Sequence, residues 1–484
     1  MKDLKSLLQG VDVKSIVGAE DVAVNHLTYD SRAVGGGDCF FALRGTQVDG
    51  HRFIDGAVAA GASVVVCEQL PKICNHGVSY VVVENSTTAM ADMAAAFYGN
   101  PSHELALVGV TGTNGKTTIA TLLYDMFNAM GHPSGLISTV VYRIGERTIP
   151  STHTTPDVIR LNQMLREMVD SGCTHCFMEV SSHSVVQQRI RGLKFRGAIF
   201  TNLTHDHLDY HGTFAEYIKA KKGLFDSLSK QAFAVVNVDD RNGEVMLQNT
   251  KARTYRYSLR SAADFKCKLL EMHFDGMLLQ IDGEELWVNF LGRFNAANLL
   301  AVYSAARLLG CEKGEVLRVM SMLHSVAGRF EPIRSANGVT AIVDYAPTPD
   351  ALENVIDTID EIRREGNRMI VVCGCGGDRD ATKRPEMGRI ASERADTVIF
   401  TSDNPRTENP EKILDDIVAG AVAGCRMLRI TDRRQAIATA AMLAQAGDII
   451  LIAGKGHEDY QIIGSEKIHF DDREEIRAAF EQMK

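Results

Sequence analysis

A glycine-rich segment near residue 112 constrains the fold of this chain more than any other feature of its sequence. An apolar run, Leu105–Val110, precedes it, and a stretch with apolar residues at helical spacing follows from Lys116 onward. A loop between a strand and a helix N-terminus binds phosphates through its backbone N–H groups. The segment therefore predicts a P-loop nucleotide-binding domain. Its residues are Gly112, Thr113, Asn114, Gly115, Lys116, Thr117 and Thr118.

Two side chains of this loop have the chemistry that a nucleoside triphosphate requires. The ammonium of Lys116 can reach the β- and γ-phosphates, and the hydroxyl of Thr117 can hold Mg²⁺. Val110 stands where the strict GxxxxGK[ST] pattern has its first glycine. A glycine-rich turn without a ligand is the alternative interpretation. The sequence favours ATP and Mg²⁺ as ligands.

The chain is long enough for several domains. Its 484 residues exceed what one hydrophobic core can serve and suit about three domains. Turn-rich segments near residues 100 and 330 mark the breaks. We expect domains at residues 1–101, 102–332 and 333–484.

The last of these units has a clear strand and helix pattern. Apolar runs at 340–343, 369–373, 397–401 and 448–452 alternate with amphipathic stretches. This alternation is typical of right-handed βαβ units in a parallel sheet, whose ligands gather beyond the carboxyl ends of the strands. We predict an α/β fold with three domains: an α/β N-terminal domain, a central P-loop ATPase domain with a mostly parallel sheet, and a C-terminal Rossmann-like domain.

Composition excludes several classes of function. The net charge of −9 leaves no basic excess for nucleic acid. No apolar run reaches the ~18 residues of a membrane span, and the polar first ten residues are unlike a signal peptide, so we expect no membrane insertion and a cytoplasmic protein. The ten cysteines are scattered, as is usual for reduced thiols. Two close pairs, 173/176 and 373/375, lack a second half at zinc spacing and read as core cysteines. We expect a monomer.

Three polar positions outside the loop have chemistry of interest. Glu179 ends an apolar run, where a carboxylate can face the phosphates, although strand-end glutamates also occur on surfaces. His207 lies among the His and Asp residues of segment 202–211, although a lone histidine is usually structural. Lys221 lies in segment 217–225, which from its residues alone reads as a solvated, basic helix end.

These segments, in this order, resemble the Mur ligase family. The matching motifs are TGTNGKTT, NLTHDHLDYHG and YIKAKKGLF. Members of the family use ATP and Mg²⁺ to join an amino acid to a nucleotide-linked peptidoglycan precursor by way of an acyl phosphate. The resemblance implies a catalytic group of Lys116, Glu179, His207 and Lys221, in which Thr117, Glu179, His207 and a modified Lys221 bind Mg²⁺.

The modification is a carbamate, which forms from an amine and CO₂. In the family, the lysine of the AKxxLF pattern carries it, and the change turns an ammonium into an oxygen ligand for Mg²⁺. By position this residue is Lys221, whereas Lys219 and Lys222 do not fit the register.

Further motifs imply where the substrates bind. The start Asp30-Ser31-Arg32, followed by GDCFFALRG, looks like the uridine-binding start of the ligases that add the third peptide residue. Pro347 stands where the family usually has a histidine, and it removes a polar ring and a backbone donor. The residues implied to hold UDP-MurNAc-L-Ala-D-Glu are Ser31, Thr154, Thr155, Ser181, Gln187 and Arg189. Those implied to bind ATP beyond the phosphate loop are Asn295, Asn298, Arg329 and Asp344.

The loops of the C-terminal domain indicate which amino acid is added. The sequence DNPR at 403–406 resembles the signature of ligases that add meso-diaminopimelate, and an arginine fork matches a carboxylate that lysine lacks. Glu458 is expected to pair with an ammonium. Segment 374–377 alone could suggest a dinucleotide loop, but it lacks the GxGxxG spacing. The residues implied to hold diaminopimelate are Arg379, Asp403, Asn404, Pro405, Arg406, Gly454 and Glu458.

Three rival functions stay open at this point. A lysine-adding homologue is disfavoured by the DNPR sequence, and a folylpolyglutamate-type ligase is disfavoured by the N-terminal DSR segment. A P-loop ATPase that binds muropeptides without ligating them belongs to another class. Release of ADP that depends on substrate, with no tripeptide formed, would favour it.

Overall fold

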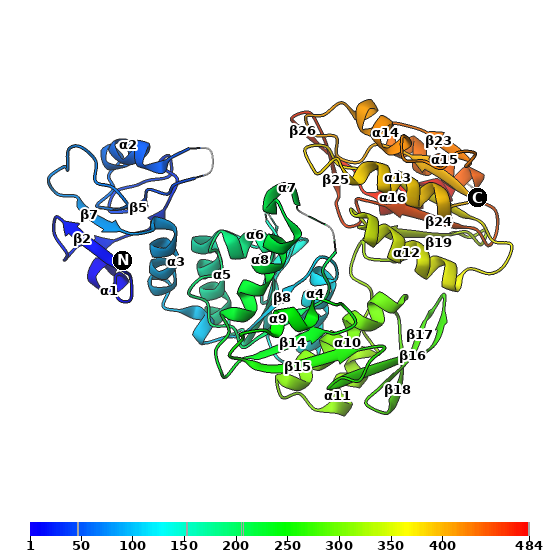
Figure 1. Cartoon of the computed structure of the whole chain (residues 1–484), viewed down its shortest axis with the longest axis horizontal. Coiled ribbons are helices and arrows are strands. Elements are labelled where there is room, and N and C mark those ends of the chain that lie inside the picture. The colour runs from blue at the N-terminus through cyan, green and yellow to red at the C-terminus, as the bar shows by residue number, and fades with distance from the viewer. Residues whose placement is uncertain (46–47, 152, 205, 207, 483–484) are drawn as a thin grey trace.

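The computed structural model describes residues 1–45, 48–151, 153–204, 206 and 208–482. Figure 1 shows three units in chain order, the first in blue, the second in cyan and green, and the third in yellow to red. Each unit has its own sheet with helices packed against it. The predicted three-domain α/β architecture is confirmed.

The N-terminal unit is a five-stranded sheet in the order β2-β7-β6-β5-β4. Strands β4 to β7 are parallel, and β2 runs antiparallel to β7. Helix α3 begins after Asn85, whose side chain accepts the N–H of Thr88. The helices are α1 (Leu4–Leu7), α2 (Ile54–Ala59) and α3 (Ser86–Phe97), and the strands are β1 (Lys2–Asp3), β2 (Val13–Val17), β3 (Ala23–Val24), β4 (Leu27–Thr28), β5 (Cys39–Phe41), β6 (Val64–Cys67) and β7 (Ser79–Val83).

The central unit has an eleven-stranded sheet in the order β11-β10-β9-β12-β8-β13-β14-β15-β16-β17-β18. In this order the strands from β9 through β12, β8, β13, β14 and β15 to β16 are parallel, and antiparallel strands stand at both ends, so the sheet is mostly parallel as predicted. Its strands are β8 (Ala106–Thr111), β9 (Ser134–Ile137), β10 (Val141–Ile144), β11 (Arg147–Pro150), β12 (His175–Glu179), β13 (Gly197–Phe200), β14 (Phe233–Asn237), β15 (Arg253–Ser258), β16 (Phe265–His273), β17 (Gly276–Ile281) and β18 (Glu284–Val288).

Helices cover both faces of this sheet because its strands are apolar on both faces. Val108 and Val110 pack in the cluster that contains α4, α10 and α11, whereas Leu107 packs in the cluster of α5 and α8. The helices are α4 (Lys116–Ala129), α5 (Val158–Asp170), α6 (Ser182–Val186), α7 (Leu208–His211), α8 (Phe214–Asp226), α9 (Gly243–Leu247), α10 (Arg293–Leu308) and α11 (Lys313–Met320).

The C-terminal unit has a six-stranded sheet in the order β19-β20-β24-β21-β22-β23. All strands except β19 are parallel, with helices on both faces, as expected for a Rossmann-like domain. Strand β19 begins at Glu331, so the expected boundary after residue 332 falls inside it. The strands are β19 (Glu331–Arg334), β20 (Thr340–Asp344), β21 (Met369–Cys373), β22 (Thr397–Phe400), β23 (Met427–Arg429), β24 (Ile449–Ala453), β25 (Tyr460–Ile463) and β26 (Glu466–His469), and the helices are α12 (Pro349–Ile362), α13 (Lys383–Arg394), α14 (Pro410–Val418), α15 (Arg433–Leu443) and α16 (Asp472–Gln482).

Two expectations from composition can be compared with the structure. The cysteines at 173, 176, 373 and 375 are buried and free of disulfides, so their assignment to the core is confirmed. Within the described part of the chain, we find no helix whose length and apolar character would suit a bilayer crossing.

A buried ion pair fastens the last helix to the C-terminal sheet. Arg433 donates through Nε and Nη2 to the two carboxylate oxygens of Asp472, at 2.7 and 2.8 Å, and both side chains are fully buried. Arg433 also donates to the carbonyl of Ala453, at 3.1 Å. Because a buried charge is costly when it loses its partner, this pair is a sensitive point for stability.

We predict that Asp472→Asn lowers the free energy of unfolding of this domain by about 3–5 kcal/mol, because Arg433 keeps its charge without a carboxylate. The matched control is Glu393→Gln, which breaks the exposed pair with Arg389 and should cost less than about 1 kcal/mol. Calorimetric melting of the full chain measures both. Equal effects of the two substitutions would contradict the prediction.

Candidate functional site

Two glycines allow the phosphate loop, between β8 and α4, to pack closely against its neighbours. Gly112 has φ +150°, and a Cβ there would lie 1.8 Å from Thr201 Oγ1. Gly115 has φ +86°, and a Cβ there would lie 2.6 Å from Asn298 Oδ1. Any side chain at either position would therefore push the loop away from β13 and α10.

Two lysines converge on one carbonyl oxygen of this loop. Lys116 Nζ donates to the carbonyls of Gly112 and Thr113, at 3.0 and 2.7 Å. Lys221 Nζ, from α8, donates to the same Gly112 carbonyl at 2.7 Å. Lys221 is only 1% exposed, and its Nζ lies 4.7 Å from the ring centroid of Tyr217. Lys221 is therefore a buried residue of the loop environment, and the interpretation as part of a solvated helix end is wrong for this residue.

The surroundings disfavour the charged forms of both lysines. Burial lowers the pKa of Lys116, while the carboxylates of Glu179 and Asp206 raise it in part. Burial, and then the charge of Lys116, hold the pKa of Lys221 well below its ordinary value. An anion bound at the loop would therefore relieve an unfavourable concentration of positive charge.

Glu179 lies at the end of β12 and is completely buried. Its Oε1 accepts the N–H of Thr139 at 2.7 Å, and its Oε2 accepts the hydroxyl of the same residue at 3.1 Å. Its backbone oxygen accepts the hydroxyl of Thr155 at 2.8 Å. The carboxylate is therefore fixed in orientation and acts electrostatically on Lys116.

Five of the six residues implied to hold the acceptor form one connected group around Glu179. The hydroxyls of Thr139 and Thr154 lie within hydrogen-bond distance, at 3.1 Å, and the N–H of Ser181 donates to the Thr155 hydroxyl at 3.3 Å. Arg189 donates to the Thr155 carbonyl and to the Gln187 side chain, both at 2.6 Å. The loop after β12 and the segment before α5 thus share one hydrogen-bond network.

The sixth residue, Ser31, lies in the N-terminal unit after β4. Its neighbour Tyr29 has a raised pKa, first through burial and then through the carboxylate of Asp157, while Arg189 lowers it. Tyr29, next to the Asp30–Arg32 turn, is therefore within electrostatic range of Arg189.

The remaining residues predicted for ATP lie on α10, in the link to the C-terminal unit and at the end of β20. Asn298 Nδ2 donates to Asn295 Oδ1 at 3.3 Å, and both side chains are buried. Arg329 Nη2 donates to Thr117 Oγ1 at 3.2 Å, so it reaches the phosphate loop. Asp344 Oδ2 accepts the N–H of Phe330 at 2.6 Å, and burial raises the pKa of Asp344 to about 6.

A second link between the central and C-terminal units was not predicted from the sequence. Asp350, in the first turn of α12, accepts hydrogen bonds from Asn114 Nδ2 at 2.8 Å and from Thr204 Oγ1 at 3.4 Å. Nearby, the carbonyl of Pro347 accepts the ammonium of Lys383 at 2.6 Å. The segment in which proline replaces the family histidine therefore still contacts the phosphate loop, through Asp350.

The residues predicted for diaminopimelate lie in three loops after β21, β22 and β24. Asn404 Nδ2 donates to Glu458 Oε2 at 2.7 Å, and Asn404 N donates to Asp403 Oδ1 at 2.6 Å. At Gly454 a Cβ would lie 2.6 Å from Asp403 Oδ2, so only glycine fits there. Burial, and then the charge of Asp403, raise the pKa of Glu458. These three loops form one cluster.

Two arginines complete the cluster. Arg406 has φ +51°, donates through Nη1 to the Gly377 carbonyl at 2.7 Å and is held through its N–H by the Ile462 carbonyl at 3.1 Å. The positive φ of Arg406 places this residue, which follows Pro405, in the left-handed region of backbone conformation. Arg379 is exposed, and its Cγ and Arg406 Nη1 both approach Gly376. The side chains of Arg379 and Arg406 therefore both pass close to Gly376.

Tyr345 connects this cluster with the phosphate loop. The guanidinium of Arg329 lies 4.5 Å from the centroid of its ring. Burial raises the pKa of Tyr345, and the negative charge of Glu458 raises it further. The tyrosine thus lies between Arg329, which bonds Thr117, and the residues predicted for the amino acid.

Thr117 and Glu179, two of the implied Mg²⁺ ligands, lie in the described part of the chain. Where the structure describes the chain, no three His, Cys, Asp or Glu side chains are grouped as metal ligands. His207, which the resemblance implied as a ligand, lies outside the described residues. Mg²⁺ commonly binds one or two protein groups together with substrate phosphates and waters, so a cluster of three is not required. Glu179 and Thr117 fit this pattern.

Sequence reasoning missed several residues of these sites. Tyr217 lies inside the motif YIKAKKGLF, and Lys455 lies inside GKGHE at 454–458, so both stand within segments that already pointed to the sites. Thr139 and Tyr345 carry no local signal for their contacts, because only the fold brings them to Glu179 and Arg329.

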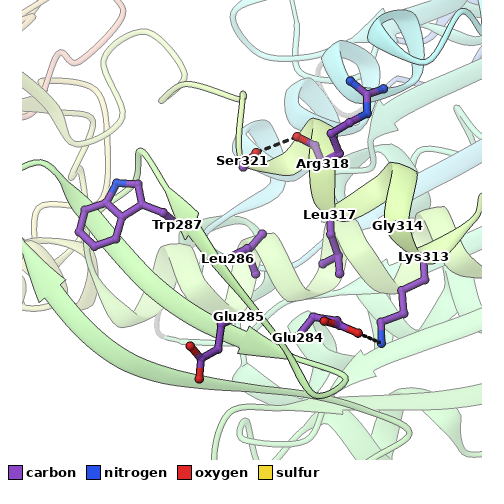
Figure 2. A pocket seen from close by; sticks show the side chains of 9 residues that line it. All are labelled: Glu284, Glu285, Leu286, Trp287, Lys313, Gly314, Leu317, Arg318 and Ser321. Carbon is purple, nitrogen blue, oxygen red and sulfur yellow. Dashed lines mark hydrogen bonds and ion pairs between the residues drawn. The ribbon is translucent and has the colours of Figure 1, made fainter.

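Another hollow lies in the central unit. Figure 2 shows it between β18 and α11, with Trp287 and Leu317 among its lining side chains and an ion pair between Glu284 and Lys313. It contains none of the predicted site residues.

We predict that Gly115→Ala raises the Kd for ATP by about 10- to 100-fold, because the new Cβ displaces backbone donors from the phosphates. The matched control is Gly131→Ala, at the other end of α4. Gly131 also has positive φ (+79°), but nothing lies within 4 Å of its Cβ position. Both substitutions carry the same backbone strain, so similar ATP affinities by calorimetric titration would contradict the steric argument.

Comparison with known proteins agrees with this geometry. Residues 23–98 match the Mur ligase family catalytic domain, residues 110–306 the Mur ligase middle domain, and residues 328–456 the Mur ligase glutamate ligase domain. A UDP-N-acetylmuramoyl-L-alanyl-D-glutamate--2,6-diaminopimelate ligase from Phocaeicola vulgatus is 54% identical, and the match covers 99% of each chain. One from Clostridium tetani is 39% identical, also over 99% of each chain.

Solved structures give the same result. The structure of a UDP-N-acetylmuramoyl-L-alanyl-D-glutamate--2,6-diaminopimelate ligase matches with a TM-score of 0.71 at 33% identity, covering 100% of this chain and 99% of that one. The MurF ligase of Thermotoga maritima in complex with ADP matches in fold, with a TM-score of 0.64 at 19% identity over 100% of this chain and 99% of that one. Together, the three domain matches, the full-length relatives and the converging motifs establish that this chain belongs to the Mur ligase family.

Proposed function

We propose that this protein is an ATP-dependent ligase that adds meso-diaminopimelate to UDP-N-acetylmuramoyl-L-alanyl-D-glutamate. The observation that carries the proposal is the cluster of Asn404, Arg406 and Glu458, joined through Tyr345 and Arg329 to a phosphate loop. A phosphate loop joined to a cluster with charges of both signs suits an enzyme that activates a carboxylate with ATP and then supplies a zwitterionic amino acid. The full-length relatives that are ligases of this name support it.

The reaction takes place in two steps. First, the D-glutamyl side-chain carboxylate of the acceptor attacks the γ-phosphorus of ATP, and ADP leaves. Second, the amine of diaminopimelate attacks the acyl carbon of the resulting acyl phosphate, inorganic phosphate leaves, and the amine loses a proton. Both steps move negative charge among phosphate oxygens, so positioning and cationic stabilisation carry the catalysis.

The phosphate loop and its neighbours hold ATP. The backbone N–H groups of residues 112–118 surround the phosphates. When ATP binds, the ammonium of Lys116 leaves the carbonyls of the loop and donates to the β- and γ-phosphates. Arg329 neutralises phosphate charge from the C-terminal side. Asn295, Asn298 and Asp344 bind the nucleoside portion. Mg²⁺ would be held by Thr117, Glu179 and His207 together with a modified Lys221, and it would stabilise the charge of the phosphates.

The environment of Lys221 suits carbamylation. Reaction with CO₂ requires a neutral amine, and burial beside Lys116 favours the neutral form of Lys221. The carbamate then carries negative charge next to the ammonium of Lys116, which removes the repulsion between the two lysines. Its oxygens can bind Mg²⁺, as an ammonium cannot.

The acceptor is held across the N-terminal and central units. Ser31 and its turn contact the uridine portion, and Arg189 and Gln187 bind the MurNAc-dipeptide. Thr154, Thr155 and Ser181 place its D-glutamyl carboxylate near Glu179 and the loop. The ten free cysteines suit a reducing compartment, and we place the enzyme in the cytoplasm as a monomer.

Diaminopimelate occupies the cluster of the C-terminal loops. Arg406 and Arg379 bind the carboxylate of its distal centre, and Asn404 adds a neutral donor. Glu458 binds the distal ammonium, and Asp403, Pro405 and Gly454 shape the pocket wall. L-Lysine lacks the distal carboxylate and would leave a guanidinium unpaired.

We predict that Lys221→Ala lowers kcat at least about 100-fold, because a ligand of the metal and of the transition-state charge is lost. Short carboxylic acids should partly restore the rate by supplying the missing oxygens. The matched control is Lys219→Ala on the same helix, whose side chain is 77% exposed and which should behave as wild type. An active enzyme with bound Mg²⁺ and an unmodified Lys221 amine in a crystal structure would disprove the carbamate.

We predict that the wild-type enzyme prefers meso-diaminopimelate over L-lysine by about 10⁴ in kcat/KM, because sites built for a polar group reject analogues that lack it. Arg406→Ala should lose most of this preference, chiefly by raising the KM for diaminopimelate. Replacing the exposed Arg426 by alanine is the control. Ligation assays with a panel of diamino acids measure these values. Comparable values for the two amino acids would favour a lysine-adding enzyme, and ADP release without tripeptide would favour a non-ligating ATPase.

A further inference from the structure

Lys455 is a buried cation in the middle of the amino-acid cluster that no motif assigns to a ligand. It follows β24 within the GKGHE loop and is 0% exposed. Its Nζ donates to Glu458 Oε2 at 3.2 Å and to Asn404 Oδ1 at 3.3 Å. Since Asn404 Nδ2 also donates to Glu458 Oε2, the three side chains form a closed triangle.

This triangle determines which atoms face the pocket. Asn404 Oδ1 accepts from Lys455 and from the N–H of Ile462, at 2.9 Å, so its amide orientation is fixed. Glu458 Oε2 receives both of its donors from within the triangle. Glu458 Oε1 accepts no hydrogen bond from any residue that the structure describes. This oxygen is therefore the one left for a ligand.

The charges around Glu458 show why a cation is needed there. Asp403, from the loop after β22, disfavours the ionised form of Glu458, as does burial, whereas Lys455 favours it. The hydroxyls of Tyr345 and Tyr460 also lie within electrostatic range. Without Lys455, two acidic groups would share a largely dry pocket, and Glu458 would take up a proton more readily.

We infer that Lys455 is a positioning residue for the amino-acid substrate, which keeps Glu458 ionised and turns its Oε1 toward the distal ammonium. The inference rests on the proposed function of this cluster. Lys455 supplies a cation beside the two carboxylates of Asp403 and Glu458, in addition to Arg406 and Arg379, which are proposed to bind the distal carboxylate. The cluster thus has charges of both signs, as does the zwitterionic distal centre of diaminopimelate, which carries one carboxylate and one ammonium.

The test compares Lys455→Met with wild type, with kcat and KM measured for meso-diaminopimelate and for ATP from about pH 6 to pH 9. We expect kcat/KM for the amino acid to fall by about 10- to 100-fold, through KM, with the KM for ATP unchanged. Binding of the ammonium is lost as the pH falls through the pKa of Glu458. Because loss of Lys455 raises this pKa, the acidic limb of the profile should move to higher pH.

Two further variants separate charge from packing. Lys455→Gln retains a donor for Asn404 without the charge, so it should show the same shift of the acidic limb. If Lys455→Met does not fold, the Lys455→Gln variant replaces it in the test. In a Glu458→Gln background, Lys455→Met should add little loss, because no carboxylate remains to be kept ionised. Lys467→Met is the control, because Lys467 also packs on Tyr460, at 3.8 Å, but from the exposed strand β26.

The outcomes distinguish the inference from the function on which it rests. A wild-type enzyme that does not ligate diaminopimelate would overturn the proposed function. If the wild-type enzyme ligates diaminopimelate but the acidic limb does not move in either Lys455 variant, only the role of Lys455 is overturned. Additive losses in the Glu458→Gln background would do the same.

Discussion

The crowding of positive charge at the phosphate loop is the constraint on which the site depends. Lys116 and Lys221 both donate to the carbonyl of Gly112, and Arg329 reaches the same loop through Thr117. Burial disfavours both ammonium groups, so the loop is stabilised by a triphosphate, by loss of a proton or by conversion of an amine to an anion. The energetic cost of this arrangement without a ligand is what makes the loop selective for a polyanion.

The link between the two catalytic units follows from the same residues. Arg329 lies between Thr117 and Tyr345, and Asn114 of the loop donates to Asp350 of the C-terminal unit. These contacts join the loop to the start of α12 and to the edge of the amino-acid cluster. In the proposed reaction, this connection places the amine donor beside the activated carboxylate only when both units contact the nucleotide.

The amino-acid cluster shows a different electrostatic solution. At the phosphate loop Lys116, Lys221 and Arg329 lie close together, whereas the amino-acid cluster combines Arg379, Arg406 and Lys455 with the carboxylates of Asp403 and Glu458. A pocket with charges of both signs, fixed by hydrogen bonds, discriminates by position, because a ligand lacking one group leaves one protein charge unpaired. The two clusters thus suit the two kinds of substrate, a polyanion and a zwitterion.

The sequence by itself determined the three-domain α/β architecture and the segments of the sites, because strand periodicity, the glycine loop and the ordered motifs are local signals. The run at 369–373 became β21, and the loop at 112–118 lies between β8 and α4 as predicted. The individual contacts could not be read from it. From its residues alone, Lys221 read as solvated, yet its approach to the phosphate loop buries it. Tyr345, Asp350 and Lys455 likewise gain their roles from neighbours up to hundreds of residues away, because burial and pairing of charges are properties of the tertiary structure.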